Sequence, residues 1–298
     1  MCDRPGGSSR LVAAPHYPHR VPRVRFGVVL LVPAAVADQV DGLRRAFGDP
    51  ALGRVPPHVT LVPPVNVRAD DVAATLRVLR EAASASRPLT MVLGPPRTFE
   101  GDEGVVYLAV RGSEADEASL RRLHEALRSG PLERPLDHPF VPHVTVATGV
   151  APERIASRLD SAAGFCDVEV VFDRVHLLQQ QAEPPHRWLP VADVALQPAI
   201  VVGRGGLPVE LTPAELVDSE ALDVLAEARG PDRDDVPEGA RALVVVARRD
   251  HAPVGLAEGW TAGPVAELVA VRTLDPTDGT DDHLRAAWWS AAADRGAS

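Results

Sequence analysis

Hydrophobic positions between residues 23 and 100 of this 298-residue chain follow two alternating spacings. Runs in which every second position is apolar indicate strands, and runs with apolar residues three and four positions apart indicate amphipathic helices. Val36, Val40, Leu43 and Phe47 have helical spacing, for example. The predicted elements, in order, are a strand Arg25–Val32, a helix Ala34–Phe47, a strand His58–Val62, a helix Ala69–Ala85 and a strand Leu89–Leu93.

The same order of elements recurs in the next hundred residues. The second set is a strand Val105–Val110, a helix Glu114–Ser129, a strand His143–Ala147, a helix Pro152–Ala162 and a strand Asp167–Phe172, and strands Val175–Leu178 and Trp188–Val194 follow. Both sets contain the tripeptide His-Val-Thr, at residues 58–60 and 143–145, which are 85 positions apart. Such a duplication predicts an α+β fold of two lobes related by a pseudo-two-fold axis.

The two tripeptides have matching surroundings, with a proline before each histidine. Because side chains alternate across a strand, His58 and Thr60 share one face while Val59 lies on the other. His143 and Thr145 share a face in the same way. If the two copies face each other, the axis brings both histidines and both threonines into one cleft. The alternative, that each tripeptide is an ordinary exposed strand segment, does not explain the repetition.

Two imidazoles around one reacting centre can act as general base and general acid near neutral pH. In a displacement at phosphorus, one histidine removes a proton from the attacking hydroxyl or water, and the other protonates the departing ribose oxygen. The threonine hydroxyls donate hydrogen bonds to the non-bridging oxygens. We therefore predict His58 and His143 as catalytic residues and Thr60 and Thr145 as phosphate-binding residues, with no metal and no cofactor. The pattern does not distinguish the base from the acid.

Four further side chains near the motifs are weaker candidates. Arg54 and Phe140 lie in the Pro-rich segments before the two motifs, where they could hold a phosphate and stack on a base, respectively. A surface arginine and a core phenylalanine are the alternatives. His138 lies five residues before His143, but intervening prolines prevent a helix that would align the two as metal ligands. His124 is predicted to lie on a solvated helix face.

The paired motif resembles that of the two-histidine (2H) phosphoesterase superfamily, which includes RNA 2',3'-cyclic phosphodiesterases and the 2'-5' RNA ligases. The family motif, His-hydrophobic-Thr/Ser-hydrophobic, is matched at residues 58–61 and 143–146, and the similarity extends over residues 23–197. The resemblance implies a bilobal α+β fold with a central cleft, and metal-independent opening or making of phosphodiesters that involve a ribose 2'-oxygen. Val62-Pro63-Pro64 departs from the aromatic and glycine element of the bacterial cyclic phosphodiesterase branch, so the substrate stays open.

The distribution of charge along the chain limits the classes of substrate that it could bind. The net charge is -10, and all 31 basic side chains are arginines, which excludes lysine catalysis. Residues 1–199 carry 22 Arg against 23 Asp and Glu, whereas residues 200–298 carry 9 against 18. Because affinity for nucleic acid needs clustered cations, one long nucleic-acid surface is excluded. A nucleotide or short RNA end in a local pocket remains as the expected partner.

Several features of the sequence bear on the cellular location of the protein. Cys2 and Cys166 are the two cysteines, so no disulfide framework is predicted and a cytoplasmic setting is expected. Residues 23–37 resemble a secretory signal, but helical spacing continues across the apparent cleavage point. No apolar stretch reaches the roughly 20 residues of a membrane-spanning helix, so no membrane association is predicted. Residues 1–22, rich in Pro, Gly, Arg and His, are predicted to form a flexible tail.

Residues 198–298 are predicted to form a separate, acidic unit. Its predicted elements are a helix Pro213–Arg229, strands Ala242–Arg248, Val254–Trp260 and Ala266–Arg272, and a helix His283–Asp294. This order resembles the N-terminal two thirds of a GNAT acetyltransferase, an α/β fold. The resemblance rests on the sequence segments at residues 244–248, 254–257 and 266–271.

The GNAT resemblance implies a coenzyme A site, but the turn that should form it is altered. In that family an Arg/Gln-x-x-Gly-x-Gly/Ala turn binds the pyrophosphate at a helix N-terminus. Here residues 275–282 contain one glycine and no arginine, and Asp281 and Asp282 would repel the pyrophosphate and cap the helix themselves. We therefore predict a degenerate, truncated GNAT-like fragment that does not bind coenzyme A and has a structural or protein-binding role.

These patterns predict a metal-independent phosphoesterase that acts on 2',3'-cyclic phosphates or 2'-5' linkages at RNA ends or in nucleotides. Two alternatives remain open. One is a two-lobed protein that binds a nucleotide or RNA end without turning it over. The other is an N-acetyltransferase with an accessory phosphoesterase-like domain.

Overall fold

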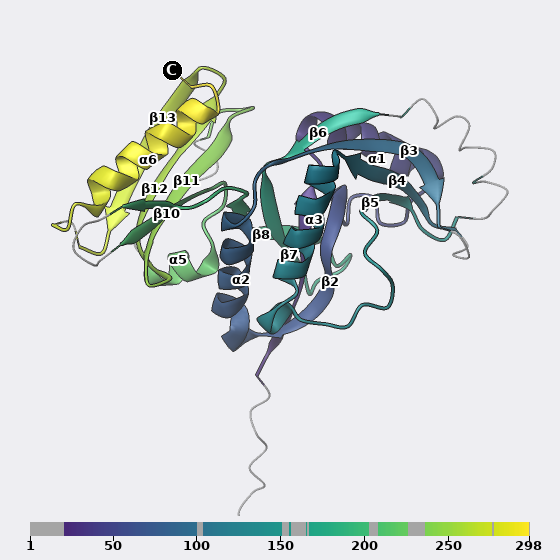
Figure 1. The fold of residues 1–298 in the computed structure, drawn as a ribbon, viewed down its shortest axis with the longest axis horizontal. Helices are drawn as coiled ribbons and strands as arrows, with labels where there is room; N and C mark the ends of the chain where they lie inside the picture. The colour runs from purple at the N-terminus through teal and green to yellow at the C-terminus, as the bar shows by residue number, and fades with distance from the viewer. Residues whose placement is uncertain are drawn as a thin grey trace, which may run out of the picture.

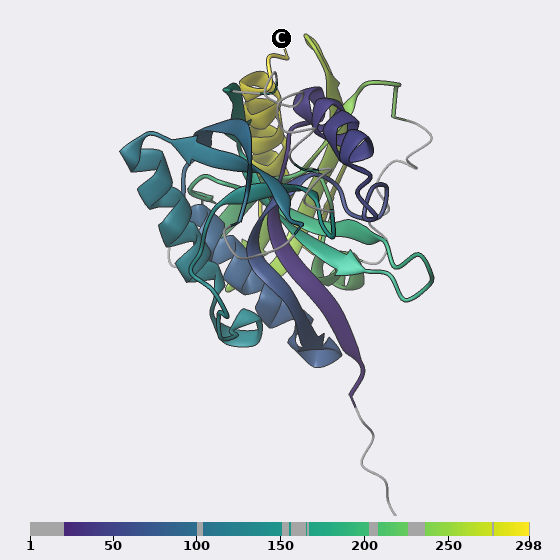
Figure 2. The same cartoon turned by 90° about the vertical axis from the view of Figure 1, so that its right-hand side faces the viewer.

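The chain folds into two sheets, one of eight strands and one of five, in a computed structural model (Figure 1, Figure 2). The structure describes residues 21–99, 104–150, 155, 165, 167–202, 208–225, 236–275 and 277–297. Of the predicted tail, residues 1–20 lie outside these ranges.

The elements of the first unit follow the predicted repeat. They are β1 (Arg23–Leu31), α1 (Ala34–Phe47), β2 (His58–Arg68), the 3-10 turn η1 (Ala69–Asp71), α2 (Val72–Ser84), β3 (Leu89–Thr98), β4 (Val106–Gly112), α3 (Glu114–Leu127), the 3-10 turn η2 (Gly130–Leu132), β5 (His143–Ala147), β6 (Val168–Phe172), β7 (Arg174–Gln180) and β8 (Trp188–Ala195). The predicted helix Pro152–Ala162 lies outside the described residues except for Ile155, which is helical.

The two motif strands are neighbours at the centre of the eight-stranded sheet, whose order is β6-β3-β4-β5-β2-β1-β7-β8. β1 pairs antiparallel with β2, and β4 with β5, so the first two strands of each sequence copy form equivalent pairs on either side of the centre. β3 crosses from the first copy to the half that contains β4 and β5. β6 and β7 lie near opposite ends of the order, yet only Asp173 separates them in the sequence. The sheet therefore curls until its ends approach each other.

Helix α3 illustrates how local sequence fixes a helix and its packing. Ser113 caps its N-terminus, because the Ser113 hydroxyl accepts a hydrogen bond from the backbone N of Asp116 at 3.1 Å. Leu120, Leu123 and Leu127, at helical spacing, are buried in the core against the sheet. α2 lies beside α3 (Figure 2).

Among the described residues, no helix is both long and apolar enough to cross a membrane.

The second unit contains the five-stranded antiparallel sheet and one long helix. Its elements are β9 (Ile200–Val202), β10 (Val209–Ala214), α5 (Ser219–Val224), β11 (Arg241–Arg249), β12 (Ala252–Ala262), β13 (Val265–Thr273) and α6 (Thr280–Asp294). α6 covers one face of the sheet, and α5 packs on the other (Figure 1). Trp288 of α6 is fully buried, and its indole N donates to the carbonyl O of Leu243 at 2.9 Å. The three predicted strands and the C-terminal helix are present.

The predicted helix Pro213–Arg229 was wrong in its first third. Residues 209–214 form strand β10, which pairs with β9 and β11, and Pro213 lies opposite Val245. Apolar and polar residues alternate at Val209, Glu210 and Leu211, and the two apolar side chains are buried. This alternation is typical of a strand, and the strand extends to Ala214. The helix begins only at Ser219, after Asp218, which accepts a hydrogen bond from the backbone N of Ala221. Residues 226–229 lie outside the described ranges.

The N-terminus of α6 is not capped as predicted. Asp281 and Asp282 lie in its first turn, but neither forms a side-chain cap there, and the N-cap position is Gly279 in the left-handed conformation. The carboxylate of Asp278 instead accepts from the backbone N of Thr280 at 2.9 Å. The acidic first turn nevertheless complements the positive end of the helix dipole.

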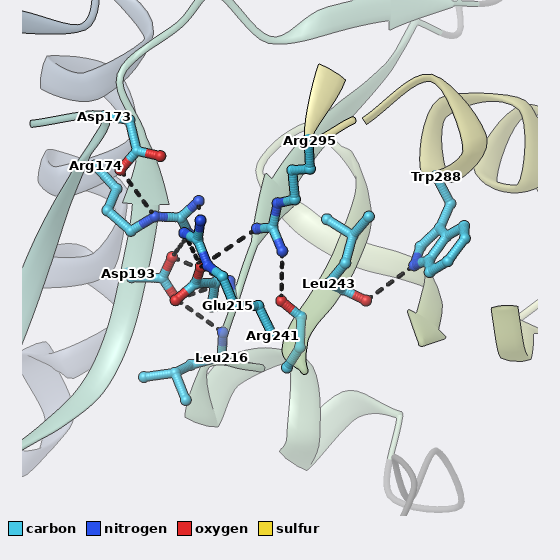
Figure 3. A network of polar contacts seen from close by, with 10 residues as sticks. Asp173, Arg174, Asp193, Glu215, Leu216, Arg241, Leu243, Trp288 and Arg295 are labelled. Atoms are coloured by element: carbon cyan, nitrogen blue, oxygen red, sulfur yellow. Dashed lines mark hydrogen bonds and ion pairs between the residues drawn. The ribbon is translucent and has the colours of Figure 1, made fainter. Parts of the chain in front are cut away.

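A network of polar contacts around Asp193 and Glu215 joins the two sheets (Figure 3). Asp193, on β8, is buried and forms an ion pair with Arg174 of β7. The same carboxylate accepts a hydrogen bond from the backbone N of Glu215 at 3.0 Å. Oε1 of Glu215 lies 2.5 Å from Nη2 of Arg241 and 3.5 Å from Nη2 of Arg295. Charged side chains of both units therefore share one partly buried network.

Candidate active site

The two His-Val-Thr strands pair with each other in antiparallel register, with Val59 opposite Val144. Both valines are fully buried, whereas the histidines and threonines of the motifs are half-buried, so the predicted division into two faces is present. Because the strands are antiparallel, Thr60 and His143 lie at one end of this short pair. His58 and Thr145 lie at the other end, on the same face of the sheet. The pairing thus brings the four predicted residues together.

Each motif histidine is held in the same way by the backbone that precedes it. Nδ1 of His58 lies 2.7 Å from the carbonyl O of Pro56, and Nδ1 of His143 lies 2.7 Å from the carbonyl O of Val141. A carbonyl oxygen only accepts, so each Nδ1 carries the hydrogen. In the neutral form, Nε2 of each ring is therefore an unprotonated acceptor, and in the charged form it is a donor. Both rings present the nitrogen that can transfer a proton.

The electrostatic surroundings of the two histidines differ. Burial lowers the pKa of His58 below its usual value, the bond to Pro56 opposes this, and the positive charges of Arg44 and His143 lower the pKa further. Burial also lowers the pKa of His143, and the bond to Val141 opposes it. The pKa of His58 is thus lowered by two neighbouring cationic groups in addition to burial.

A cavity of about 440 Å³ adjoins the end of the strand pair where Thr60 and His143 lie. Its walls are mainly apolar and aromatic, and they consist of Thr60, Leu61, Pro63, Phe99, His124, Leu136, His138, Pro139, Phe140, Val141 and His143. His58 and Thr145, at the other end of the pair, are not among these residues. The cavity is large enough for a nucleotide-sized group beside one histidine.

The two weaker candidates differ in position. Phe140 lines the cavity and is half-buried. Arg54 is not among the lining residues, and its Nε is buried without a hydrogen-bond partner among the described residues. Its backbone carbonyl accepts from the backbone N of Trp188 at 2.8 Å, which anchors the loop before the first motif. The structure therefore brings Phe140, but not Arg54, into this cavity.

Aromatic side chains around His143 were not predicted from the sequence. The ring of Phe99 meets that of His143 edge to face, with centroids 5.0 Å apart, and Tyr107 does so at 5.5 Å. Phe99 and Tyr107 also stack on each other at 4.2 Å. Tyr107 of β4 lies opposite Thr145 of β5, so it shares the face of the site. No local pattern reveals this contact, because it depends on which strands pair.

Arg44 is a second residue near the site that the sequence did not suggest. It is 3% exposed on α1, and its guanidinium donates to the carboxylates of Asp49 at 2.8 Å and Asp41 at 2.9 Å. It also donates to the carbonyl O of Val55 at 2.8 Å, three residues before His58. Arg44 therefore fixes the approach to the first motif, and its charge acts on His58.

The prediction that His124 lies on a solvated helix face was wrong. His124 is 4% exposed, and its spacing from Leu120, Leu123 and Leu127 shows the reason, since it falls within the buried arc of α3. His138 is exposed, at the rim of the cavity. Within the described part of the chain, no three His, Cys, Asp or Glu side chains converge as a metal site.

Sequence comparison finds relatives for the first unit. A profile of the 2'-5' RNA ligase superfamily matches residues 32–184, which ends before the five-stranded sheet begins. A Bacillus licheniformis protein named "Putative phosphoesterase" is 32% identical over 158 residues, which cover 53% of this chain and 90% of that protein. A protein of the same name from Bacillus pumilus is 31% identical over 158 residues, with the same coverage.

Two solved structures are similar to part of this chain, each with a TM-score below 0.5. LigT of E. coli in complex with 3'-AMP covers 59% of this chain and 99% of that protein, with 20% identity and a TM-score of 0.43. The match to TT0787 of Thermus thermophilus covers 58% of this chain and 98% of the TT0787 chain, with 16% identity and a TM-score of 0.43.

Proposed function

Because the chain belongs to the 2'-5' RNA ligase superfamily, we propose that its first unit is a metal-independent phosphoesterase for 2',3'-cyclic phosphates or 2'-5' linkages. The substrate would be a nucleotide or an RNA end. The observation that carries this proposal is the equivalent anchoring of His58 and His143, each through Nδ1 to a carbonyl two residues earlier. This anchoring leaves two Nε2 atoms free for proton transfer on one face of the sheet.

The reaction needs one neutral and one protonated imidazole. In hydrolysis of a 2',3'-cyclic phosphate, Nε2 of the neutral ring takes a proton from water as the water oxygen bonds to phosphorus. The bond from phosphorus to one ribose oxygen breaks, and the protonated ring gives its proton to that oxygen. The product is a phosphate monoester. Proton return between the rings through solvent restores the starting state.

We assign the base to His58 and the acid to His143. Two nearby cationic groups disfavour a proton on His58, so of the two rings it is the better candidate to be neutral. His143 lacks this additional effect, and the negative charge of a bound phosphate would favour its protonated form.

The threonines and the cavity have complementary roles in this proposal. The hydroxyls of Thr60 and Thr145, on the same face as the histidines, donate to the non-bridging phosphate oxygens as charge accumulates there. The apolar and aromatic cavity beside His143 accepts the base of a nucleotide, with Phe140 available for stacking. Arg54 has no role in this cavity.

Turnover of 2',3'-cyclic nucleotides in the presence of EDTA tests the proposal. The 298-residue chain is expected to release a nucleoside monophosphate, whereas His58→Ala and His143→Ala each lose at least about 10²-fold in kcat/KM, because each removes one proton-transfer group. A 2'-5'-linked dinucleotide and its 3'-5' isomer, in parallel, identify the linkage.

His283→Ala is the matched control, since His283 is exposed on α6 of the other unit. It should retain wild-type turnover. Tight nucleotide binding without product would favour the binding-only alternative, and equal activity of the wild type and both motif variants would refute the assignment.

For the second unit, we propose a structural role beside the phosphoesterase. The network around Asp193 and Glu215 supports it, because buried charges of both units satisfy each other there. The acidic first turn of α6 opposes a pyrophosphate at that helix end, which argues against the acetyltransferase alternative. Calorimetric titration with acetyl-coenzyme A should give no saturable heat.

A further inference from the structure

His124 on α3 is a buried polar side chain that contacts both motif segments. Its Nδ1 donates to the carbonyl O of Leu61 at 2.7 Å, and its ring stacks on Phe140 with centroids 3.9 Å apart and planes 6° from parallel. Leu61 directly follows Thr60 in the first motif. Phe140 lies three residues before His143 in the second. One side chain therefore connects the two halves of the candidate active site.

The carbonyl that His124 binds belongs to an irregular position of β2. In the pairing of β2 with β1, consecutive residues of β1 lie opposite Thr60 and Val62, so Leu61 is an extra residue. The extra residue makes a β-bulge in β2, and both Leu61 and Val62 are fully buried there. Such a β-bulge re-aims neighbouring side chains and is common beside active sites. The bulge therefore sets the direction in which Thr60 projects.

The surroundings of His124 explain why an imidazole is useful there. Leu120, Leu123 and Leu127 occupy the same face of α3, and burial lowers the pKa of His124 while its bond to Leu61 opposes this. A buried carbonyl without a hydrogen-bond partner would destabilise the fold. The imidazole satisfies this carbonyl at a position where a fourth leucine could not.

We propose that His124 is a positioning residue for the phosphoesterase reaction. Through the bulge at Leu61 it orients Thr60. Through its stack on Phe140 it holds the segment that carries His143. This inference rests on the proposed function and assigns His124 no proton transfer and no contact with the reacting atoms.

Two variants separate the two contacts of His124. His124→Phe keeps a ring against Phe140 and removes the donor, whereas His124→Asn keeps a short donor and removes the ring. With a 2',3'-cyclic nucleotide, His124→Phe is expected to lower kcat about tenfold or more with little change in KM, because the lost bond orients a group that acts in the transition state. His124→Asn should recover only part of this loss in kcat, because it restores a donor for Leu61 but lacks the ring that stacks on Phe140. Wild-type kcat in a folded His124→Phe variant would overturn the role of the bond to Leu61.

Imidazole NMR provides a readout that does not require turnover. Long-range ¹H–¹⁵N spectra report which ring nitrogen carries the proton, and the bond to Val141 predicts the Nδ1–H form for wild-type His143. In His124→Asn, the Nε2–H form of His143 should increase, and the signals of exposed His283 should not change. An unchanged His143 spectrum would overturn the role of the stack, whether or not the wild type turns over.

Melting temperatures establish that each variant is folded. If neither His124 variant folds, Phe140→Leu removes the stack from the other side and permits the same NMR comparison. An unchanged His143 spectrum in Phe140→Leu would refute the proposed coupling.

Discussion

Val59 on β2 lies directly opposite Val144 on β5, and neither side chain is exposed to solvent. An antiparallel pair has a local two-fold axis between its strands, so this contact relates one His-Val-Thr tripeptide to the other. Thr60 is thereby placed beside His143, and His58 beside Thr145. The buried valines thus fix the arrangement that the half-buried residues offer to a substrate.

From this arrangement we expect both threonines to act on the same phosphate. Thr60→Val and Thr145→Val keep the branched shape of the side chain and remove only the hydroxyl, so each should lower kcat by about 10²-fold, the usual effect of losing one transition-state donor. Steady-state kinetics with a 2',3'-cyclic nucleotide measures the effect. Thr60→Ser and Thr145→Ser, which keep a hydroxyl, are the matched controls. A valine variant with the kcat of its serine counterpart would exclude that hydroxyl from the reaction.

The pH dependence follows from the lowered pKa values of both histidines. Since catalysis needs one neutral and one protonated ring, kcat/KM should be bell-shaped with its maximum below about pH 6.5, the ordinary histidine pKa. The acid limb reports protonation of the base, and the alkaline limb reports loss of the proton from the acid. The two apparent values belong to the coupled pair. The profile of kcat should extend to higher pH, because bound phosphate favours a protonated neighbour. A maximum clearly above the ordinary histidine pKa of about 6.5 would contradict the lowered pKa values of the two histidines.

Local periodicity was enough to predict much of the fold. α1 and β5 have the predicted bounds, because their apolar spacing is regular and a proline precedes each element. The alternation within His58 to Leu61 likewise predicted which side chains are buried. These features depend only on neighbours in the sequence, so a single sequence contains the necessary information.

Contacts between distant segments could not be predicted in this way. The extra residue Leu61 depends on the register of β2 against β1, and Tyr107 reaches His143 because β4 pairs with β5. His124 had a detectable signal in its helical spacing, but its polarity suggested solvent. Its partner is a backbone carbonyl 63 residues away in the chain, which side-chain patterns do not reveal.

The contact between the two sheets predicts a large effect of one buried carboxylate on stability. Asp193→Ala leaves Arg174 buried without its main partner and removes the acceptor for the backbone N of Glu215 (Figure 3). The expected loss is about 3–5 kcal/mol of unfolding free energy. Asp173→Ala is the matched control, since Asp173 contacts the same arginine at 3.3 Å but is half exposed. It should cost less than about 1 kcal/mol. Urea denaturation measures both, and equal losses would show that the buried pair has no special role.

Glu258 of β12 should make the stability of the second unit depend on pH. It is 3% exposed, its Oε2 has no hydrogen-bond partner among the described residues, and burial raises the pKa of Glu258 to about 7, although Arg272 opposes this. In the unfolded chain this carboxyl titrates near pH 4.3, as an ordinary glutamate does. Its contribution to stability is therefore complete below about pH 4 and is lost as the pH rises through about 7.

Glu258→Gln keeps the shape of the side chain and cannot ionise. The melting temperature of this variant relative to the wild type should therefore be higher at pH 8 than at pH 5. Glu267→Gln, at an exposed position of the neighbouring strand β13, should show no such change. A Glu258→Gln difference that is the same at both pH values would mean that Glu258 is ionised throughout this range.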